Sequence, residues 1–226
     1  MNEKGFELEV IYWDWVINPA TRKLFVQKRL DVDKQDFVDN CGEFFYNLLL
    51  NAKSRPRLLD VGGGPVSRLM YAAVHGMIDI VSIDPLADEY LKLLNKYGLD
   101  VKVKPIAGKG ETILNQFGEN SFDIVYCCNA LDHSERPFIC ALHMVRAVKP
   151  GGYLMIEGFT REGTHENFVG LHQHDLCIEG DNLSHTDKQG NKTILFNSAL
   201  TCVYNNNAGT CPGAWFKIIF QKPYDT

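Results

Sequence analysis

The sequence lacks three features that each indicate a particular class of protein: a basic block, a membrane-spanning apolar run and a signal peptide. Of its 226 residues, 23 are Lys or Arg and 28 are Asp or Glu, which gives a net charge of −5 without any basic block. Binding to DNA or ribosomal RNA depends on such a block, so we expect no nucleic-acid polymer as a partner. No apolar run approaches the roughly 20 residues of a membrane-spanning helix, and the first residues lack the apolar core of a signal peptide. We expect a cytoplasmic protein without a membrane partner.

The cysteines also form no pattern that would stabilise a small domain. There are seven of them, an odd number, and no two are spaced as CxxC. This argues against a disulfide framework and against a zinc knuckle. Four of the seven lie within apolar patterns, which predicts buried free thiols, namely Cys41, Cys127, Cys128 and Cys140.

What the sequence does contain is a regular alternation of strand-like and helix-like segments. Strands are predicted at residues 55–61, 78–83, 101–106, 122–129 and 153–159. Helices are predicted between them at residues 67–74, 86–97, 110–117 and 135–148. Such an alternation predicts an α/β fold, in which a parallel sheet carries helices on both faces.

The two ends of the chain differ from this central part. Two helices are predicted near the start, an aromatic-rich one over residues 6–17 and a second over residues 33–49 with Asp33 as its cap. Near the end, strand-like runs at residues 194–204 and 214–222 have no helix between them, so we expect them to pair antiparallel at one sheet edge. A single domain follows, composed of an N-terminal helical cap (1–54), a core (55–159), a polar insertion (160–192) with a hairpin turn at KQGN, and edge strands (193–226).

The first motif with chemical meaning is LLDVGGGP, residues 58–65, where a strand enters a turn of three glycines. Glycines allow a ligand to approach the backbone closely. Asp60 precedes the first glycine by two residues; its carboxylate would repel a pyrophosphate but would suit the ammonium group of an amino acid. This favours S-adenosylmethionine (SAM) over NAD, with Asp60, Gly62 and Gly64 at the methionine end.

Two further segments follow the next strands. Asp84 ends the strand after the glycine turn, 24 positions beyond Asp60, where an acid reaches the ribose hydroxyls of an adenosine; alternatively, it caps the following helix. Leu86 would then lie against the adenine. Gly110 and Glu111 follow the third strand, where backbone groups and a carboxylate could recognise the adenine edge, although Glu111 could also be an ordinary exposed residue of a first helical turn.

In their order along the chain, these segments resemble the motifs of class I SAM-dependent methyltransferases, and in particular those described as methyltransferase type 11-like. The resemblance rests on LLDVGGGP, SIDPLADEY, GKGE, SFDIVYCCNALDHSERP and RAVKPGGYLMIEGF, and it covers roughly residues 55–160. It implies a Rossmann-like sheet of order 3-2-1-4-5-7-6 with strand 7 antiparallel. It also implies that the Asn129 backbone lies near the methionine end and that Tyr12, on a helix over the cofactor, bonds the SAM carboxylate. The sequence departs from the family at Val66, in place of a third glycine, and at Lys109, where an acid is common.

DPLADEY and NALDHS, together with GLHQ (170–173) and the aromatic N-terminal helix, are similar to one branch of this family, typified by enzymes encoded among polysaccharide and glycan biosynthesis genes. The branch implies a small polar acceptor, such as a sugar or a nucleotide-activated glycan precursor. A hydroxyl acceptor needs a base, whereas a nitrogen or a phosphate oxygen needs less help. The candidate bases are His133, at the end of the fourth strand, and His172 and His174, which an extended backbone would place on one face.

Other residues are expected to shape the acceptor side. Trp13, Asp132 and Glu157 are candidates for contact with the acceptor, although Trp13 could simply pack in the core and Asp132 could be structural. No metal site is expected; the weaker alternative is a divalent ion held by His172, His174 and either Asp132 or Glu157.

The predicted function is therefore O-methylation of a small polar acceptor with SAM as cofactor, by a monomer or homodimer. Three alternatives stay open: an N- or phosphate-directed methyltransferase, a SAM-binding module without turnover, and an NAD-dependent enzyme.

Overall fold

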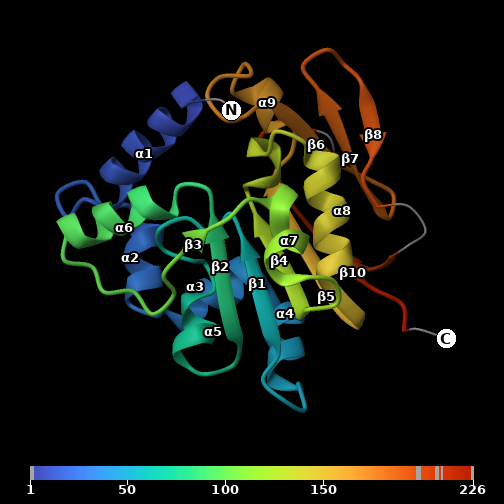
Figure 1. Cartoon of the computed structure of the whole chain (residues 1–226), viewed down its shortest axis with the longest axis horizontal. Coiled ribbons are helices and arrows are strands. Elements are labelled where there is room, and N and C mark those ends of the chain that lie inside the picture. Colours follow the sequence, from blue (N-terminus) through green and yellow to red (C-terminus); the bar gives the residue numbers. More distant parts are fainter. Residues whose placement is uncertain (1–2, 197–199, 207–208, 210, 225–226) are drawn as a thin grey trace.

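A seven-stranded sheet forms the centre of the molecule. The computed structural model describes residues 3–196, 200–206, 209 and 211–224. The strands of the sheet lie in the order β3-β2-β1-β4-β5-β10-β9 (Figure 1). They are β1 (Arg57–Val61), β2 (Asp79–Asp84), β3 (Ile106–Ala107), β4 (Phe122–Cys128), β5 (Val148–Phe159), β9 (Thr201–Asn205) and β10 (Trp215–Gln221). The first five are parallel, and β10 is antiparallel to both β5 and β9.

The strand order agrees with the methyltransferase topology once the strands are counted within this sheet alone. The labels differ from 3-2-1-4-5-7-6 because three further strands intervene along the chain: β6 (His174–Glu179), β7 (Asn182–Asp187) and β8 (Lys192–Ile194). These form a separate antiparallel sheet, which the sequence did not predict. The strand predicted over residues 194–204 is not continuous: β8 ends at Ile194 and β9 begins at Thr201, and residues 197–199 lie outside the described part of the chain. The turn at KQGN does connect β7 with β8.

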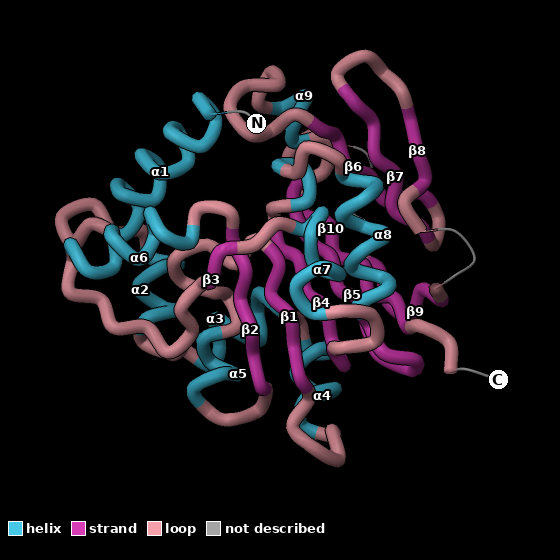
Figure 2. The backbone as a smooth tube through the Cα atoms, in the orientation of Figure 1, coloured by secondary structure: helices cyan, strands magenta, loops and turns pink. Residues whose placement is uncertain are grey.

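Helices cover both faces of the large sheet, as predicted. They are α1 (Glu3–Ile17), α2 (Leu24–Leu30), α3 (Lys34–Cys41), α4 (Glu43–Leu50), α5 (Met70–Val74), α6 (Ala87–Lys96), α7 (Ile113–Phe117), α8 (Pro137–Ala147) and α9 (Glu162–His165). Two single-turn 3-10 helices, η1 (Gly110–Thr112) and η2 (Leu131–His133), precede α7 and α8. In Figure 2, α7 and α8 pass in front of the sheet, whereas α3 and α4 lie behind it.

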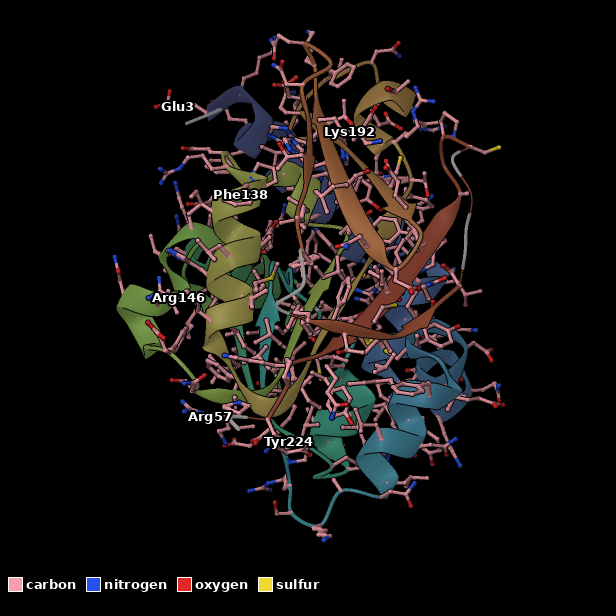
Figure 3. The ribbon with its side chains drawn as sticks, turned by 90° about the vertical axis from the view of Figure 1, so that its right-hand side faces the viewer. Glu3, Arg57, Phe138, Arg146, Lys192 and Tyr224 are labelled. Atoms are coloured by element: carbon pink, nitrogen blue, oxygen red, sulfur yellow. The ribbon has the colours of Figure 1, made fainter. Side chains whose placement is uncertain are left out.

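Two apolar cores result, one on each face of the sheet. Successive strand residues point to opposite faces, so Leu58 packs with the aromatic side chains of α1, α3 and α4, and Leu59 packs with the residues of α8. In the side view of Figure 3, α8 stands at the surface of the molecule, with Phe138 and Arg146 on its outer side. Cys41, Cys127 and Cys140 are buried and Cys128 is partly buried, all as free thiols, which agrees with the expectation from the sequence.

The differences from the predicted elements have local causes. The helix expected over residues 33–49 is divided at Gly42, whose φ of 90° ends α3; Asp33 does cap it, accepting from the Asp36 N–H at 2.7 Å. Of the strand expected over residues 101–106, only the end is found, as β3. Val101 and Val103 alternate with polar residues because their side chains pack in the core, not because their backbone pairs with another strand. Helix α5 begins three residues later than predicted, because the Ser67 side chain bonds back to Asp60.

The carboxyl ends of the parallel strands all point toward one end of the molecule. In Figure 1 this is the end where α1, α9 and the small sheet lie. In open α/β sheets ligands bind in the crevice outside these strand ends, so the fold places the glycine turn, Asp84, η1 and the NALDHSERP loop around one region.

Candidate active site

A cavity of about 1060 Å³ opens at this edge of the sheet. Its wall includes the backbone turns that follow β1, β2, β3 and β4, at residues 61–64, 84–86, 108–111 and 128–130. Side chains of α1 and of the segment between α9 and β6 complete the enclosure. The volume is at the upper end of what small-molecule and cofactor sites have, so the cavity can hold a cofactor together with a second molecule.

The glycine turn fits a closely held ligand. Gly62 and Gly64 have positive φ values of 71° and 64°, a conformation that favours glycine. A Cβ on Gly63 would lie 2.1 Å from the Ser82 Oγ, and one on Gly64 would lie 3.1 Å from the Trp13 ring. Side chains are therefore excluded from the turn, and its backbone faces the cavity.

Asp60 lies beneath this turn and is 2% exposed. Its Oδ2 accepts hydrogen bonds from the Ser67 hydroxyl at 2.7 Å and from the Ser82 hydroxyl at 3.3 Å. Burial raises the pKa of the Asp60 carboxyl to about 6, although these two hydrogen bonds lower it in part. Asp60 lines the cavity, and it also fixes the start of α5, a structural role that the sequence did not predict.

The Asp84 carboxylate, at the end of β2, joins the glycine turn to the turn before α6. Its Oδ2 accepts from the Gly64 N–H at 3.1 Å, and its Oδ1 accepts from the Leu86 N–H at 2.9 Å. Helix α6 begins only at Ala87 and has no side-chain cap, so the predicted capping role is wrong; the carboxylate instead closes a turn to the residue two positions on. Burial raises the pKa of Asp84 to about 7. Both Asp84 and Leu86 line the cavity, where a ribose and an adenine were predicted.

The turn at η1 closes the opposite end of the cavity. The Glu111 Oε1 accepts from the backbone N–H of Arg136 at 3.1 Å, which holds η1 against the start of α8. A Cβ on Gly110 would lie 2.0 Å from the Cys140 Sγ. Both residues line the cavity, and the close packing explains why glycine stands at position 110.

Gly110→Ala is therefore expected to displace η1. Overpacking of this kind costs about 1–3 kcal/mol, so we expect the melting temperature to fall by several degrees and S-adenosylhomocysteine (SAH) to bind at least about tenfold more weakly. The double variant Gly110→Ala/Cys140→Ala should recover most of both losses, whereas Cys140→Ala alone should change SAH binding little. Thermal unfolding with and without SAH measures these effects; a double variant as impaired as the single one would show that Cys140 is not the obstacle.

Helix α1 lies across the cavity and lines it with three aromatic residues, Phe6, Tyr12 and Trp13. Trp13 donates from Nε1 to the Glu9 carboxylate at 2.9 Å and packs edge-on against Tyr90, with ring centroids 6.2 Å apart. Tyr12 is more exposed, at 46%. Both line the cavity, so Trp13 is at once a core residue and part of the wall.

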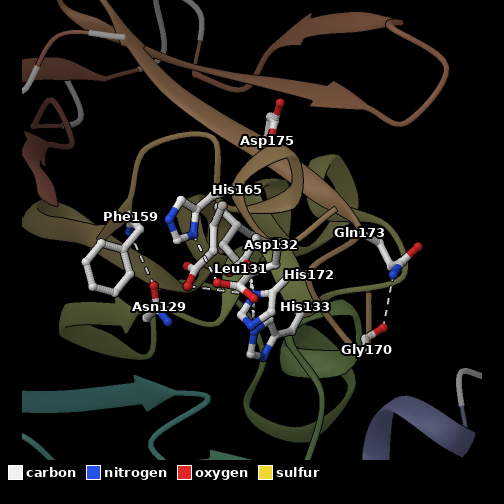
Figure 4. A network of polar contacts seen from close by, with 12 residues as sticks. Asn129, Leu131, Asp132, His133, Phe159, His165, Gly170, His172, Gln173 and Asp175 are labelled. Carbon is white, nitrogen blue, oxygen red and sulfur yellow. Dashed lines mark hydrogen bonds and ion pairs between the residues drawn. The ribbon is translucent and has the colours of Figure 1, made fainter. Parts of the chain in front are cut away.

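The loop after β4 brings together a carboxylate and two imidazoles. The backbone at Asn129 has a φ of 50°, and its side-chain oxygen accepts from the Phe159 N–H at 3.3 Å. Asp132, on η2, is 3% exposed, and its Oδ2 lies 2.8 Å from the His172 Nδ1. The His133 Nε2 lies 3.1 Å from that same Nδ1 and 3.5 Å from the Asp132 Oδ2 (Figure 4). We call Asp132, His133 and His172 the histidine cluster.

Within the histidine cluster, neighbouring groups stabilise the carboxylate of Asp132 and the imidazolium of His172. Burial alone would raise the pKa of the Asp132 carboxyl, but His133 and His172 hold it below its usual value. Burial alone would lower the pKa of His172, but the hydrogen bond and the charge of Asp132, together with Glu162, raise it to about 9. Asp132 and an imidazolium at His172 therefore form an ion pair at neutral pH.

Glu162, at the start of α9, is a site residue that the sequence did not predict. It lines the cavity, and its Oε1 lies 3.9 Å from the His172 Nδ1. Among the described residues, its buried Oε2 has no hydrogen-bond partner. Burial, followed by the charge of Asp132, raises the pKa of Glu162 to about 7. It lies in the predicted polar insertion, where no pattern distinguished it from a surface glutamate.

The structure separates other predicted site residues from the cavity. The predicted shared face of His172 and His174 is wrong: hydrogen bonds from the Gln173 N–H to Leu171 and from the His172 N–H to Val169 bend the chain before β6. The His174 ring instead meets His185 at 2.8 Å across the small sheet. Asp132 and Glu157 lie behind the cavity wall rather than among its described lining residues, so their positions favour supporting roles over direct contact with an acceptor.

The histidine cluster is also the one set of described residues whose donor atoms could hold a metal ion, since these atoms lie within 4.8 Å of one another. Two imidazoles and a carboxylate suit several divalent metals. Of the residues in the alternative metal site considered from the sequence, His172 and Asp132 do meet, but His174 and Glu157 lie elsewhere. Metal binding requires deprotonated ligands, and it would have to displace the proton that Asp132 retains on His172.

Comparisons with known proteins support a methyltransferase. A family model described as a methyltransferase domain matches residues 59–156. The mitochondrial ubiquinone biosynthesis O-methyltransferase of Schizosaccharomyces pombe is 26% identical over 83% of this chain and 70% of its own. The sterol 24-C-methyltransferase of Aspergillus fumigatus is 25% identical over 74% of this chain, which spans only 46% of that protein. The crystal structure of a SAM-dependent methyltransferase from Methanosarcina mazei superposes with a TM-score of 0.53 at 16% identity, covering 81% of this chain and 98% of that one.

With the sheet topology and the glycine turn, these matches identify the chain as a SAM-dependent methyltransferase whose cofactor is SAM. The two curated relatives transfer the methyl group to different kinds of acceptor, one of them named for oxygen and the other for carbon. No helix in the described part of the chain is both long and apolar enough to cross a membrane.

Proposed function

We propose that this enzyme methylates a hydroxyl group of a small polar acceptor, and that His133 removes the hydroxyl proton. The observation that carries the proposal is the histidine cluster, placed where the strand ends open into the cavity, with His133 and His172 in the cavity wall. A sugar or a nucleotide-activated glycan precursor is the proposed acceptor class, on the basis of the NALDHSERP resemblance.

The cofactor fits the other half of the cavity. The proposed contacts are Asp60, Gly62, Gly64 and the Asn129 backbone for the methionine end, Asp84 for the ribose, and Leu86, Gly110 and Glu111 for the adenine. Two buried carboxylates suit an ammonium group and a pair of hydroxyls, and the glycine turn admits no side chain. Tyr12 and Trp13 cover this half from α1. When bound, SAM supplies a methyl group activated by its sulfonium, and the chain orients the acceptor and excludes water.

The position of the Asp132 charge supports a base at His133. The His172 Nδ1–H donates to the Asp132 Oδ2, and the same oxygen lies 3.5 Å from the His133 Nε2. We propose that a ring nitrogen of His133 with a free lone pair accepts the hydroxyl proton. The Asp132 charge then stabilises the resulting imidazolium. Glu162, with a pKa of about 7, is a second group that could accept a proton in the same region.

The test is methyl transfer from radiolabelled SAM to a panel of free sugars, nucleotide sugars, catechols and small amines, with the modified atom assigned by NMR. A product methylated on oxygen is the expected result. A product methylated only on nitrogen would redirect the proposal to an N-methyltransferase. Tight SAH binding without any product from cell extracts would indicate a binding module without turnover.

Chelation tests the role of the histidine cluster separately. If a chelator abolishes turnover and an added divalent cation restores it, Asp132, His133 and His172 act as metal ligands, and the base must be sought elsewhere. Unchanged turnover after chelation is the expected result, because a metal ion would have to displace the proton through which His172 bonds Asp132.

A further inference from the structure

Three basic side chains line the cavity on the side away from the adenine end. They are Arg29 from α2, Arg68 from the segment between β1 and α5, and Lys217 from β10. Arg68 and Lys217 are 15% and 8% exposed. We call these three residues the cationic wall. Long basic side chains normally keep their charges in bulk water, so their arrangement around an internal cavity needs a cause.

One carboxylate lies within ion-pair distance of the cationic wall, among the described residues. The Glu157 Oε1 lies 3.2 Å from the Arg68 Nη1, and its Oε2 lies 3.2 Å from the Lys217 Nζ. Glu157 is itself fully engaged, since it also accepts from the Tyr126 hydroxyl and from the Trp215 Nε1. Arg29 donates to the Val66 carbonyl at 2.9 Å, and the described residues offer it no carboxylate partner.

Positive charge therefore predominates at the cationic wall. Within ion-pair distance the three cations have one carboxylate, and Asp60 acts on Arg29 and Arg68 only from a longer distance. The neighbouring Cys128 and Tyr126 do not offset the positive charge, because burial raises the pKa of Cys128 to about 12 and that of Tyr126 above its usual value, so both are neutral at physiological pH. Charge held away from water without a partner is costly. A wall with this predominance of positive charge suits an anion.

Arg68 is positioned rather than free to rotate. Its guanidinium lies over the Trp215 ring at 4.7 Å, and its buried Nε has no hydrogen-bond partner among the described residues. A guanidinium held on an aromatic face and paired through one of its nitrogens keeps further N–H groups for a planar oxyanion. The Lys217 Nζ adds a second kind of donor, an ammonium group held by the Asn40 carbonyl and Glu157.

SAM brings one carboxylate of its own, which can pair with one cation of the cationic wall. Arg29 is the candidate for that contact, because its partner Val66 lies two residues beyond Gly64, the last glycine of the turn. Arg68 and Lys217 lie instead beside β5, where Glu157 is opposite Lys217 in the strand register. These two cations, with Glu157 as their shared partner, then remain beside the space left for the acceptor.

We propose that Arg68 and Lys217 form a subsite for an acidic group, a phosphate or a carboxylate, on the methyl acceptor. The proposal rests on the function proposed above and narrows the acceptor to an acidic or phosphorylated molecule. Trp215 holds the guanidinium in place, and Glu157 keeps both cations at the cavity wall.

The test is calorimetric titration of inorganic phosphate, and separately of acetate, into the enzyme saturated with SAH. We expect at least one of the two anions to bind, and Arg68→Met and Lys217→Met each to weaken that binding at least about tenfold while SAH affinity stays within about twofold. Arg146→Met and Lys192→Met, which remove exposed cations paired with Glu119 and Glu179, are the matched controls and should change nothing. Arg68→Lys keeps the charge, so it should retain part of the binding even if Arg68→Met folds poorly.

Two results would overturn this subsite. The first is that neither anion binds the SAH-saturated enzyme although both bind the free enzyme, because the cationic wall would then serve the SAM carboxylate alone. The second is binding that survives in both Met variants. Neither result concerns methyl transfer itself, so a failure of the proposed function, seen as absence of any methylated product, is distinguishable from a failure of the subsite.

Discussion

Replacing His133 with alanine is expected to lower turnover at least about 100-fold, because the attacking hydroxyl loses the group that takes its proton. The affinity for SAH should stay within about twofold, since the proposed cofactor contacts lie on the glycine turn, Asp84 and η1. His172→Ala should lower turnover as well, through His133, because the His172 Nδ1 lies between His133 and the buried Asp132 carboxylate. Steady-state kinetics with the acceptor found above, together with calorimetric titration of SAH, measure the two quantities.

His174→Ala is the matched control for this experiment. It removes an imidazole two positions from His172 that bonds to His185 on the small sheet and does not line the cavity within the described residues. We expect it to retain near-wild-type turnover. If His133→Ala and His172→Ala also retain it, the histidine cluster is not a base; a loss confined to Glu162→Gln would then assign the proton to Glu162.

The central part of the fold could be predicted because its determinants are local. Each strand–turn–helix unit carries its own apolar run and its own glycine or cap, and parallel strands place their carboxyl ends side by side. Asp60, Asp84 and Gly110 stand at such ends, so their positions around one cavity followed from the order of the units. The lack of a helix between the last two strand-like runs predicted their antiparallel pairing, and the resemblance to methyltransferases supplied their place in the strand order.

The acceptor side could not be predicted, because its residues come together only through tertiary packing. Arg29, Arg68 and Lys217 lie on three elements separated by long stretches of chain, and none belongs to a motif. Glu162 is the first residue of a four-residue helix in a region of polar composition, and its importance lies in burial and in the neighbouring Asp132. The alternation of His172 and His174 indicated an extended backbone, but a turn before β6 directs the two rings to different partners.

Replacing Asp84 with asparagine is expected to weaken SAH binding by about 30-fold or more. Hydrogen bonds to a charged group contribute about 1.5–3 kcal/mol each, and the variant replaces one carboxylate oxygen, which accepts from the Gly64 or Leu86 N–H, with an amide donor. The glycine turn and the ribose contact should therefore be impaired together. Asp79→Asn, at the exposed first residue of the same strand, is the control and should bind SAH normally. Calorimetric titration measures the affinity, and thermal unfolding reveals any general loss of structure.

The dependence of SAH binding on pH separates the ribose contact from a purely structural role for Asp84. Its pKa is raised to about 7 in the free enzyme, mainly by burial. Because this pKa is higher than that of an aspartate in the unfolded chain, protonated Asp84 stabilises the folded state. This contribution is fully present below the unfolded pKa and is lost as the pH rises through about 7. A ribose needs the ionised form as an acceptor, so wild-type SAH affinity should fall as the pH is lowered from 8 to 6, by up to tenfold per unit below the pKa. In Asp84→Asn the part of this dependence that centres on pH 7 should disappear, leaving only that of Asp60, whose pKa is about 6. A wild-type affinity that is flat over the same range would leave Asp84 as a support for the turn alone.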